Sequence, residues 1–465
     1  MLTYDLEQAT GPLYQYIYQC LKDDIMTGGL QGGDKLPSKR TFARNHGIST
    51  ITIQNAYDQL ISEGYIYTVP KKGYYVAKIR GMRQVPKETN LSLNIQRQEK
   101  KVEYAVDLSD NRMSPERFPF TVWAKIGREI MSDHKSELME PSPAGGTRAL
   151  REAVAEHLQS YRAMLVDPDQ IVVGAGTEYL YSLLVQLLAP RSTYCLEDPG
   201  YKKIAQVYKR CGVTCRYGRL DDQGITVDSL KRSGADIAHI SPNHHFPTGI
   251  TMPASRRYEV LAWANEKEGR YLIEDDYDSE FRLGGRPVPT LFSIDACEKV
   301  IYMNTFSKSL TPTIRISYMV LPVHLANRFY EELSFYSCTV SNFEQYTLAA
   351  FIKQGYFEKH INRMRLYYAR QRQKIKEVLE KGAPGLPCEI RENDSGLHFL
   401  LHLKTDLTDR EVVKKLAEQG VRVHALSEYY TKKQGEEHFF IINYSNLDVE
   451  KAAAAMEIIA DVTGG

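Results

Sequence analysis

Lys308 has the most reactive setting in the chain. It follows the apolar run KVIYMNTFS, with Thr305 and Ser307 beside it and Arg315 seven residues later. A lysine condenses with an aldehyde to form a Schiff base when its amine is neutral, and burial or nearby positive charge favours that form. Hydroxyl and guanidinium groups suit a phosphate. The spacing predicts that Lys308 holds a phosphorylated aldehyde cofactor, although a lysine between hydroxyl residues is by itself typical of an exposed surface.

A second phosphate-binding element is expected where the apolar start of VVGAGTEYLYSLL gives way to a helical pattern. Amides at the start of a helix attract anions. Those of Ala175, Gly176 and Thr177 are placed to point at the same phosphate. A single GxG pattern is weak evidence, and it gains weight here because other ligand-binding residue types also follow predicted strands.

Acidic and aromatic side chains follow two further predicted strands. In RYLIEDDYDSEF the strand ends in acidic residues that include Asp275, with Tyr277 next, and EDPGY places Tyr201 after another strand. A pyridine cofactor needs a buried carboxylate to keep its ring nitrogen protonated, a role that suits Asp275. Tyr277 is then placed to donate to the phenolic oxygen of the cofactor, and Tyr201 to stack on its ring. Taken singly, the acidic run also fits a solvated turn and each tyrosine a core position.

These residues need a scaffold that gathers strand ends, and the pattern of the chain predicts one. From about residue 105, short apolar runs alternate with helical patterns. That alternation indicates an α/β fold with a largely parallel sheet covered by helices, and a ligand site at the strand ends. From about Ser341 a helix-rich stretch leads to a smaller α+β unit. We expect one large domain over residues 105–465.

The N-terminal part has a different pattern. From Pro12 to Thr27 apolar residues recur every four positions, SKRTFARNH follows a capping Ser38, and a third helical pattern starts near Ser49. The runs YIYTV and YYVA flank PKKG as a hairpin. Three helices and a hairpin predict a winged helix-turn-helix at residues 10–78, followed by a linker at residues 79–104.

A winged helix-turn-helix binds DNA in a defined way. The first residues of its third helix face base edges, basic side chains hold phosphates, and the wing tip reaches a neighbouring groove or phosphate. A docking domain with solvated charged faces is the other interpretation of the same pattern. The residues expected to contact DNA are Lys39, Arg40, Arg44, Ser49, Thr50, Thr52, Gln54, Lys71 and Lys72.

Composition excludes several classes of protein. With 465 residues, 43% hydrophobic and 25% charged, the chain is neither disordered nor collagen-like and is long enough for two or three folded units. No apolar run reaches the ~18 residues of a membrane span. The seven scattered cysteines are typical of a reducing compartment, so we expect a cytoplasmic protein. Net charge is +1, but the first 104 residues hold 14 Lys and Arg against 10 Asp and Glu, which favours a nucleic-acid role for that part.

Residues 11–76 resemble the GntR family of bacterial regulators along their whole length. The most specific portions are LPSKRTFA, ITIQNAYDQLISEGYI and the wing KKGYYV. The resemblance implies that a dimer binds double-stranded operator DNA. It places Arg40, Thr50, Thr52 and Lys72 at the positions that usually contact DNA.

From Ala105 to Gly465 the chain resembles the fold-type I pyridoxal phosphate enzymes of the aspartate aminotransferase superfamily. The motifs are EDPGY, SPNHHFPTG, LIEDDYDSEF and TFSKSLTPTIRISY. A GntR head joined to such a domain is similar to the MocR/GabR family of transcriptional regulators. The resemblance implies pyridoxal 5'-phosphate as cofactor, an internal aldimine at Lys308, Asp275 at the ring nitrogen, Tyr277 at the phenolic oxygen, and the hydroxyl and arginine side chains named above at the phosphate. It also implies a domain-swapped homodimer.

Some positions depart from the family pattern. Aminotransferases typically carry asparagine before PTG, where this chain has Phe246, and this leaves one cofactor hydrogen bond open. The C-terminal run IINYSN lacks the arginine that binds substrate carboxylates, so Arg422 is the substitute candidate. Lys203, just after EDPGY, is a second candidate for an effector carboxylate. His244 and His245 have no third ligand at suitable spacing, so no metal is expected.

The expected function is that of a pyridoxal phosphate-dependent, DNA-binding transcriptional regulator. An amine or amino-acid effector displaces Lys308 to form an external aldimine, and the placement of the two DNA-binding heads changes in response. Two alternatives stay open. One is an active aminotransferase, or a sensor domain that keeps weak transaminase activity, because Lys308 can also move a proton. The other is a regulator of vitamin B6 synthesis that senses pyridoxal phosphate itself.

Overall fold

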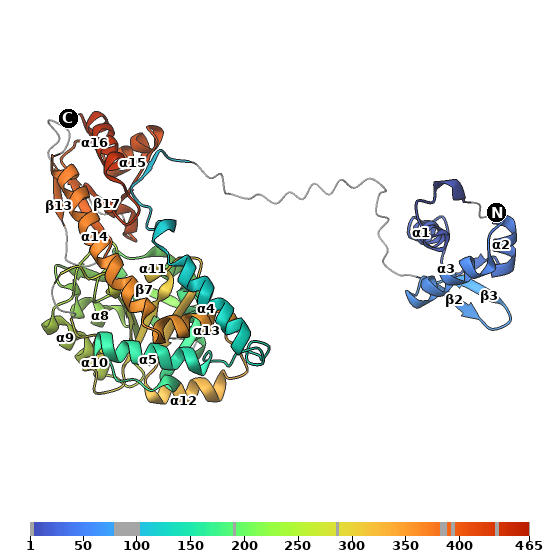
Figure 1. Cartoon of the computed structure of the whole chain (residues 1–465), viewed down its shortest axis with the longest axis horizontal. Helices are drawn as coiled ribbons and strands as arrows, with labels where there is room; N and C mark the ends of the chain where they lie inside the picture. Colours follow the sequence, from blue (N-terminus) through green and yellow to red (C-terminus); the bar gives the residue numbers. More distant parts are fainter. Residues whose placement is uncertain are drawn as a thin grey trace. The chain divides into compact units, whose positions relative to one another are not determined.

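The computed structural model describes residues 4–78, 103–188, 192–284, 288–381, 388–391, 396–432 and 437–464 (Figure 1). Contacts within the chain separate two compact units, Met1–Lys101 and Val102–Gly465. Residues 79–102, which make up most of the linker expected at 79–104, lie outside the described residues. Each unit has a hydrophobic core of its own.

The N-terminal unit is a three-helix bundle with a small antiparallel sheet, the winged helix-turn-helix expected from the sequence. Ser38 accepts a hydrogen bond from the Thr41 amide at the start of the second helix, and Ser49 caps the third helix in the same way. One strand, β1, was not expected; it pairs with β3, so the sheet order is β1-β3-β2. The elements are α1 (Leu13–Met26), β1 (Lys35–Leu36), α2 (Lys39–His46), α3 (Thr50–Ser62), β2 (Ile66–Val69) and β3 (Gly73–Val76).

The second unit is built on an eight-stranded sheet of order β5-β12-β11-β10-β9-β6-β7-β8. Strands β12 and β8 run antiparallel to their neighbours, and the other neighbouring pairs are parallel. The carboxyl ends of the parallel strands therefore lie at one edge, together with the beginning of β12. The strands are β5 (Ile171–Ala175), β6 (Thr193–Asp198), β7 (Thr214–Asp221), β8 (Gly224–Ile225), β9 (Ile237–Ile240), β10 (Tyr271–Asp275), β11 (Val300–Thr305) and β12 (Ile316–Val320).

Helices bury both faces of this sheet. Along β5, Ile171 and Val173 join a core that contains α5 and α13, whereas Val172 between them joins a core with α6 and α12. Strands buried on both faces explain the nearly continuous apolar runs in the sequence. The helices are α4 (Phe120–Asp133), α5 (Arg148–Arg162), α6 (Thr177–Leu187), α7 (Lys202–Arg210), α8 (Val227–Ser233), α9 (Ala254–Asn265), α10 (Leu291–Ile294), α11 (Phe306–Ser309), α12 (Val323–Glu332) and α13 (Asn342–Lys353).

A smaller α+β part completes the unit, as expected. Its four-stranded antiparallel sheet has the order β13-β14-β17-β16, and α14 contacts both α13 and α16. A short parallel pair joins β15 to β4 near the beginning of the unit. The elements are β4 (Val106–Asp107), α14 (Tyr356–Lys381), β13 (Cys388–Arg391), β14 (His398–Leu403), α15 (Asp409–Glu418), β15 (Val421–Arg422), β16 (His424–Ala425), β17 (Phe439–Asn443) and α16 (Val449–Thr463).

None of the helices in the described part of the chain combines the length and the apolar composition that a bilayer crossing requires.

Candidate functional site

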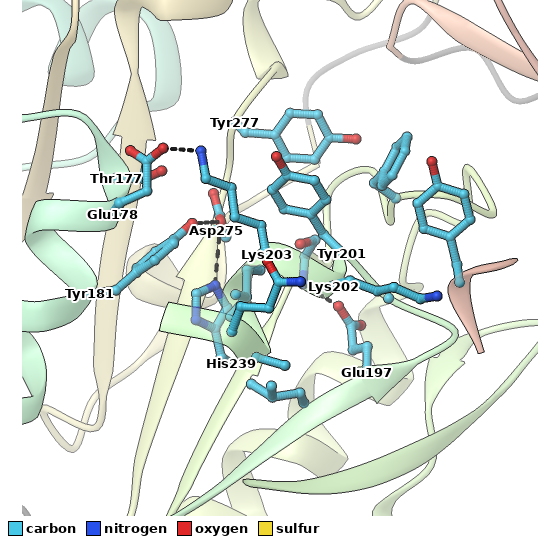
Figure 2. A pocket seen from close by; sticks show the side chains of 18 of the residues that line it. Thr177, Glu178, Tyr181, Glu197, Tyr201, Lys202, Lys203, His239, Asp275 and Tyr277 are labelled. Carbon is cyan, nitrogen blue, oxygen red and sulfur yellow. Dashed lines mark hydrogen bonds and ion pairs between the residues drawn. The ribbon is translucent and has the colours of Figure 1, made fainter. Parts of the chain in front are cut away.

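A cavity of about 800 Å³ opens at the carboxyl edge of the large sheet, where the sequence pattern placed a ligand site (Figure 2). It gathers residues that follow β5, β6, β10 and β11 and one that precedes β12. Ala175 and Arg422 are not among its lining residues. The sequence-predicted residues that line it are Gly176, Thr177, Tyr201, Lys203, Asp275, Tyr277, Thr305, Ser307, Lys308 and Arg315.

Lys308 reaches this cavity from α11, the single helical turn that follows β11. Burial lowers the pKa of its amine, and the carboxylates of Asp278 and Asp110 partly oppose that shift. We find no hydrogen bond or ion pair between Lys308 and another residue of the described ranges. An amine with a lowered pKa is neutral in a larger fraction of molecules, which makes it a better nucleophile near neutral pH.

Asp275 is held by a buried chain of hydrogen bonds. The Tyr181 hydroxyl donates to Oδ2 of Asp275 over 2.8 Å, and Nε2 of His239 lies 3.3 Å from the same oxygen. On the other side of the imidazole, the Tyr208 hydroxyl lies 2.8 Å from Nδ1. Figure 2 shows Tyr181 and His239 both directed at Asp275. The second oxygen, Oδ1, is buried without a partner among the described residues, so the site keeps one acceptor free.

Sequence reasoning missed Tyr181 and His239. Tyr181 comes four residues after Thr177, so the two share one face of α6, and this spacing was the available sign. His239 lies inside β9, where its neighbours are apolar and nothing in the local pattern singles it out. Both residues are far from Asp275 in the sequence and come next to it only when the chain is folded.

Tyr277 and His244 form a second cluster beside Lys308. Nδ1 of His244 lies 2.8 Å from Oδ2 of Asp278 and 3.1 Å from the Tyr277 hydroxyl. Burial and the nearby carboxylates hold the pKa of Tyr277 well above that of an ordinary tyrosine, so the phenol keeps its proton. Tyr277 is therefore available as a hydrogen-bond donor over the physiological pH range.

An aromatic wall borders the cavity. Tyr201 follows β6 and is 48% exposed, and its ring lies edge-on to Phe246 at 5.9 Å between centroids. Phe246, at the position where aminotransferases carry asparagine, also packs against Tyr429 and His398. Phe246 thus contributes packing in place of an amide, and the half-exposed Tyr201 face is open for stacking.

Arg315 and the first turn of α6 come together at one end of the cavity; we call Gly176, Thr177, Glu178 and Arg315 the anion pocket. Arg315 has a left-handed backbone with φ of +54°, an uncommon conformation for a residue with a side chain. Its guanidinium donates to the Ala175 carbonyl over 3.3 Å and to Glu178 over 2.8 Å. The structure thus places the predicted arginine at the predicted helix start.

Two of the three amides expected at this helix start already have acceptors. The Ala175 amide donates to the Thr339 hydroxyl and the Gly176 amide to the Gly174 carbonyl. The amides of Thr177 and Glu178 begin α6 and are the backbone donors of the pocket. Glu178, which sequence reasoning did not single out, places a carboxylate there.

The hydroxyls of Thr305 and Ser307, also predicted to bind the phosphate, differ in how far they are already engaged in hydrogen bonds. The Thr305 hydroxyl caps α11 by accepting the Ser307 amide, and it also accepts a hydrogen bond from Ser317 over 2.8 Å. Ser307 lines the cavity with a half-buried side chain. Thr305 therefore orders the turn that carries Lys308, and Ser307 has the more available hydroxyl.

Lys203 and Arg422, the two residues expected to bind an effector carboxylate, lie in different places. Lys203 lines the cavity and forms an ion pair with Glu178. Arg422 does not line the cavity: β15 pairs with β4, so Arg422 lies opposite Asp107 and forms an ion pair with it, and its contact with an effector stays a prediction. The position of Arg422 is set by the register of the β15–β4 pair. The absence of an arginine from the C-terminal run, which led us to choose Arg422, carries no information about that register.

In the N-terminal unit, the side chains of Arg40, Arg44, Thr50, Gln54, Lys71 and Lys72 are exposed and that of Thr52 is half-buried. The Ser49 hydroxyl caps α3 by accepting a hydrogen bond from the Ile51 amide. Lys39 is engaged internally: its amine lies 3.8 Å from Asp58 and over the ring of Tyr74. The exposed beginning of α3 and the wing tip fit the expected nucleic-acid interface, and Lys39 supports the fold beneath it.

The described ranges contain no group of three His, Cys, Asp or Glu side chains arranged to hold a metal ion.

Two family profiles match the chain, and together they cover both units. The family described as aminotransferase class I and II matches residues 104–459, and that of the bacterial regulatory proteins of the gntR family matches residues 13–76. A gntR-type domain binds DNA. The fold and the two profiles define a class of protein: a transcriptional regulator that carries an aminotransferase-like domain.

Curated relatives show the same arrangement over nearly their whole length. An uncharacterised HTH-type transcriptional regulator of Bacillus subtilis, YdeL, is 36% identical over 90% of each chain. The probable rhizopine catabolism regulatory protein MocR of Rhizobium meliloti is 28% identical, with 96% of this chain and 93% of that one covered. The pyridoxine biosynthesis regulator PdxR of Corynebacterium glutamicum is 29% identical over 87% and 86% of the two chains. The chain belongs to the MocR/GabR family of transcriptional regulators.

Solved structures confirm the fold of the second unit. The kynurenine aminotransferase of Pyrococcus horikoshii, determined in complex with PMP, superimposes with a TM-score of 0.68 at 22% identity over 81% of this chain and 97% of that one. A multiple substrate aminotransferase of Thermococcus profundus gives a TM-score of 0.69 with the same coverage. The fold is thus the fold-type I aminotransferase fold expected from the sequence.

Proposed function

We propose that this transcriptional regulator binds pyridoxal 5'-phosphate in the cavity of residues 105–465 and reports an amine or amino-acid effector to the DNA-binding domain at residues 10–78. The observation that carries the proposal is that one cavity holds Lys308, with its lowered pKa, and the buried Asp275 carboxylate with one oxygen free. Few ligands need both an amine nucleophile and a fixed carboxylate. A pyridine aldehyde is one of them.

The residues present fit that cofactor. Oδ1 of Asp275 would accept a hydrogen bond from the protonated ring nitrogen, while Tyr181 and His239 keep the carboxylate oriented. Tyr277 would donate to the phenolic oxygen, and Tyr201 would cover the ring. Arg315, Ser307 and the first turn of α6 would hold the phosphate. When bound, the cofactor supplies an aldehyde that condenses reversibly with amines.

The chain itself would then convert effector binding into a change of state. Lys308 would hold the cofactor, and its amine, when free, would stay inside the cavity under the influence of the Asp278 carboxylate. An effector shifts the equilibrium between two arrangements of the regulator only by its difference in affinity for them. In this proposal two chains form a domain-swapped homodimer on double-stranded operator DNA in the cytoplasm.

The test is a titration of the cofactor-loaded, full-length protein with a panel of amines and amino acids, followed by its visible absorbance. Lys308→Ala is the control, because it removes the amine nucleophile. We expect one compound to change the spectrum of the native protein and to change its affinity for operator DNA. If pyridoxal phosphate and every effector together leave operator affinity and footprint unchanged, the switching proposal is wrong.

A second candidate is that pyridoxal phosphate is itself the effector. The relative PdxR, 29% identical, is named as a regulator of pyridoxine biosynthesis. Operator binding that responds to pyridoxal phosphate without any amine would favour this candidate. Sustained consumption of a keto acid over many turnovers would instead identify an active aminotransferase.

A further inference from the structure

Glu178 places a negative charge inside the anion pocket. Its carboxylate accepts a hydrogen bond from Arg315 over 2.8 Å, pairs with Lys203 and also bonds its own backbone amide in the first turn of α6. Figure 2 shows the Glu178 side chain turned toward the Lys203 amine. Two of the donors proposed for the phosphate, Arg315 and the Glu178 amide, are thus bonded to a carboxylate of the chain.

The space around Gly176 shows how closely this carboxylate takes the place of a ligand. Gly176 has φ of +90°, and a Cβ atom added to it would lie 2.8 Å from Oε2 of Glu178 and would also collide with the Arg315 guanidinium. The space that a Cβ of residue 176 would need is thus filled by the Arg315 guanidinium, with Oε2 of Glu178 beside it. Glycine at this position lets the guanidinium and the carboxylate come close to the beginning of α6.

The Glu178 carboxylate is negatively charged at neutral pH. Burial opposes its charge, but hydrogen bonds from Lys203, its own amide and Arg315 lower the pKa of Glu178 to about 2. Nη2 of Arg315 donates to both the Ala175 carbonyl and Glu178, so a phosphate that binds through this nitrogen competes with the carboxylate for it. The two negative charges also repel each other at contact distance.

We propose that Glu178 is a resident anion: its carboxylate holds the phosphate donors of the anion pocket, and a phosphorylated ligand binds only by displacing it from Arg315. The inference rests on the proposed cofactor for the identity of the ligand. By competing for Arg315, Glu178 lowers the affinity of the regulator for phosphorylated ligands. This affinity sets the ligand concentrations over which the regulator becomes loaded.

Lys203 is the partner that receives the displaced carboxylate. It lies at the beginning of α7, 47% of its side chain is exposed, and it already contacts Glu178. After displacement, Glu178 keeps this ion pair and loses only Arg315. Lys203 is then neutralised by Glu178 and is less available for an effector carboxylate than sequence reasoning expected.

The experiment compares pyridoxal phosphate with pyridoxal, which lacks the phosphate. Dissociation constants of both compounds are measured by absorbance on the cofactor-free, full-length protein at pH 7, for the wild type and for Glu178→Gln. We expect the preference for the phosphorylated compound to rise about tenfold in Glu178→Gln, because the competing charge is gone, and pyridoxal affinity to stay unchanged. An unchanged or lower preference overturns the inference.

Two further variants separate competition from simple damage to the site. Lys203→Met leaves Arg315 as the one side chain known to pair with Glu178 among the described residues, so the preference for phosphate should fall below that of the wild type. In the Glu178→Gln background the same change should have little effect, which a double-mutant cycle measures. If Lys203→Met weakens phosphate binding equally in both backgrounds, Lys203 acts on the phosphate directly and the displaced-carboxylate step is wrong.

Glu197→Gln is the matched control. Glu197 lines the same cavity, and burial raises its pKa to about 8, so at pH 7 this change removes much less negative charge than Glu178→Gln. A preference shift in Glu197→Gln as large as in Glu178→Gln would contradict the assignment to Glu178.

Inorganic phosphate distinguishes this inference from the proposed function. If no variant takes up either aldehyde, but calorimetry shows that inorganic phosphate binds about tenfold more tightly to Glu178→Gln than to the wild type, the resident anion is supported and the proposed cofactor is wrong. If both aldehydes bind and the phosphate preference does not respond to Glu178, the proposed function stands and this inference fails.

Discussion

The hydroxyl of Tyr181 lies 2.8 Å from Oδ2 of Asp275 and joins α6 to the last residue of β10. The same helix contributes its first turn to the anion pocket, one helical turn before Tyr181. One element thus positions both the phosphate end and, through Asp275, the ring-nitrogen end of the proposed cofactor. This hydrogen bond fixes the separation of the two ends.

Replacing Tyr181 by phenylalanine should therefore weaken cofactor binding without removing it. Asp275 loses one donor and keeps His239, so we expect pyridoxal phosphate to bind about three- to tenfold more weakly, which corresponds to the ~1 kcal/mol of a typical hydrogen bond. Absorbance titration measures the change. Tyr194→Phe is the control, because the buried Tyr194 hydroxyl has no partner among the described residues. Equal losses in both variants would contradict the role of Tyr181.

The rate of cofactor uptake should depend on pH through Lys308. Burial lowers the pKa of the amine and Asp278 raises it, so Asp278→Asn should lower that pKa further. Because the neutral amine reacts, the pH profile of uptake should shift toward lower pH in this variant. Stopped-flow absorbance across the pH range gives the profile, with the exposed Asp228→Asn as control. A shift toward higher pH would contradict the prediction that the Asp278 carboxylate raises the pKa of Lys308.

Adjacent basic residues of α2 should behave differently on operator DNA. Arg40 is exposed, so Arg40→Ala should weaken binding and reduce the salt dependence of the binding constant by about one ion. Lys39 is held by Asp58 and the Tyr74 ring, so Lys39→Ala should lower the thermal stability of the DNA-binding unit and leave the salt dependence nearly unchanged. Anisotropy titrations at several salt concentrations measure the binding constants of both variants. If the salt dependence of the binding constant is equal for wild type and Arg40→Ala, Arg40 does not contact a phosphate of the DNA.

A buried ion pair supports the strand end that carries the site. Arg162 in α5 lies 2.5 Å from Oδ2 of Asp276, whose neighbours in the chain are Asp275 and Tyr277. Arg162→Met leaves this carboxylate buried without its cation and should lower the free energy of unfolding by about 3–5 kcal/mol. Urea denaturation measures the loss. The exposed pair of Arg232 and Asp228 offers the control, since Arg232→Met should cost less than ~1 kcal/mol.

The sequence was most informative where residues follow strands. Lys308, Tyr201 and the pair Asp275 and Tyr277 come from three different strand ends, and the rule that parallel strands present their carboxyl ends at one edge was enough to place them in one cavity. The winged helix-turn-helix followed from caps, periodicity and a hairpin, all of which are local. Expectations based on local pattern and on strand order therefore agreed with the fold.

Expectations that depend on distant partners were out of reach. An acidic residue in the first turn of a helix is an ordinary stabilising feature, so nothing marked Glu178, whose partners are 25 and 137 residues away. Arg422 was chosen because an arginine was missing elsewhere, but strand register, which no local pattern shows, turned it to Asp107. Charge alone likewise did not separate Lys39 from Arg40, because Asp58 and Tyr74 reach Lys39 only in the folded unit.

The reversed direction of β12 has a consequence for the order in which the protein assembles. This strand enters the sheet between β5 and β11, and its contact from Arg315 to Ala175 closes a loop of 140 residues. Contacts across such separations are slow to form. The Arg315 side of the anion pocket forms only when β12 has paired with β5, so the proposed phosphorylated ligand would stabilise only chains in which this pairing is complete. Ligand uptake would thereby be coupled to closure of the sheet.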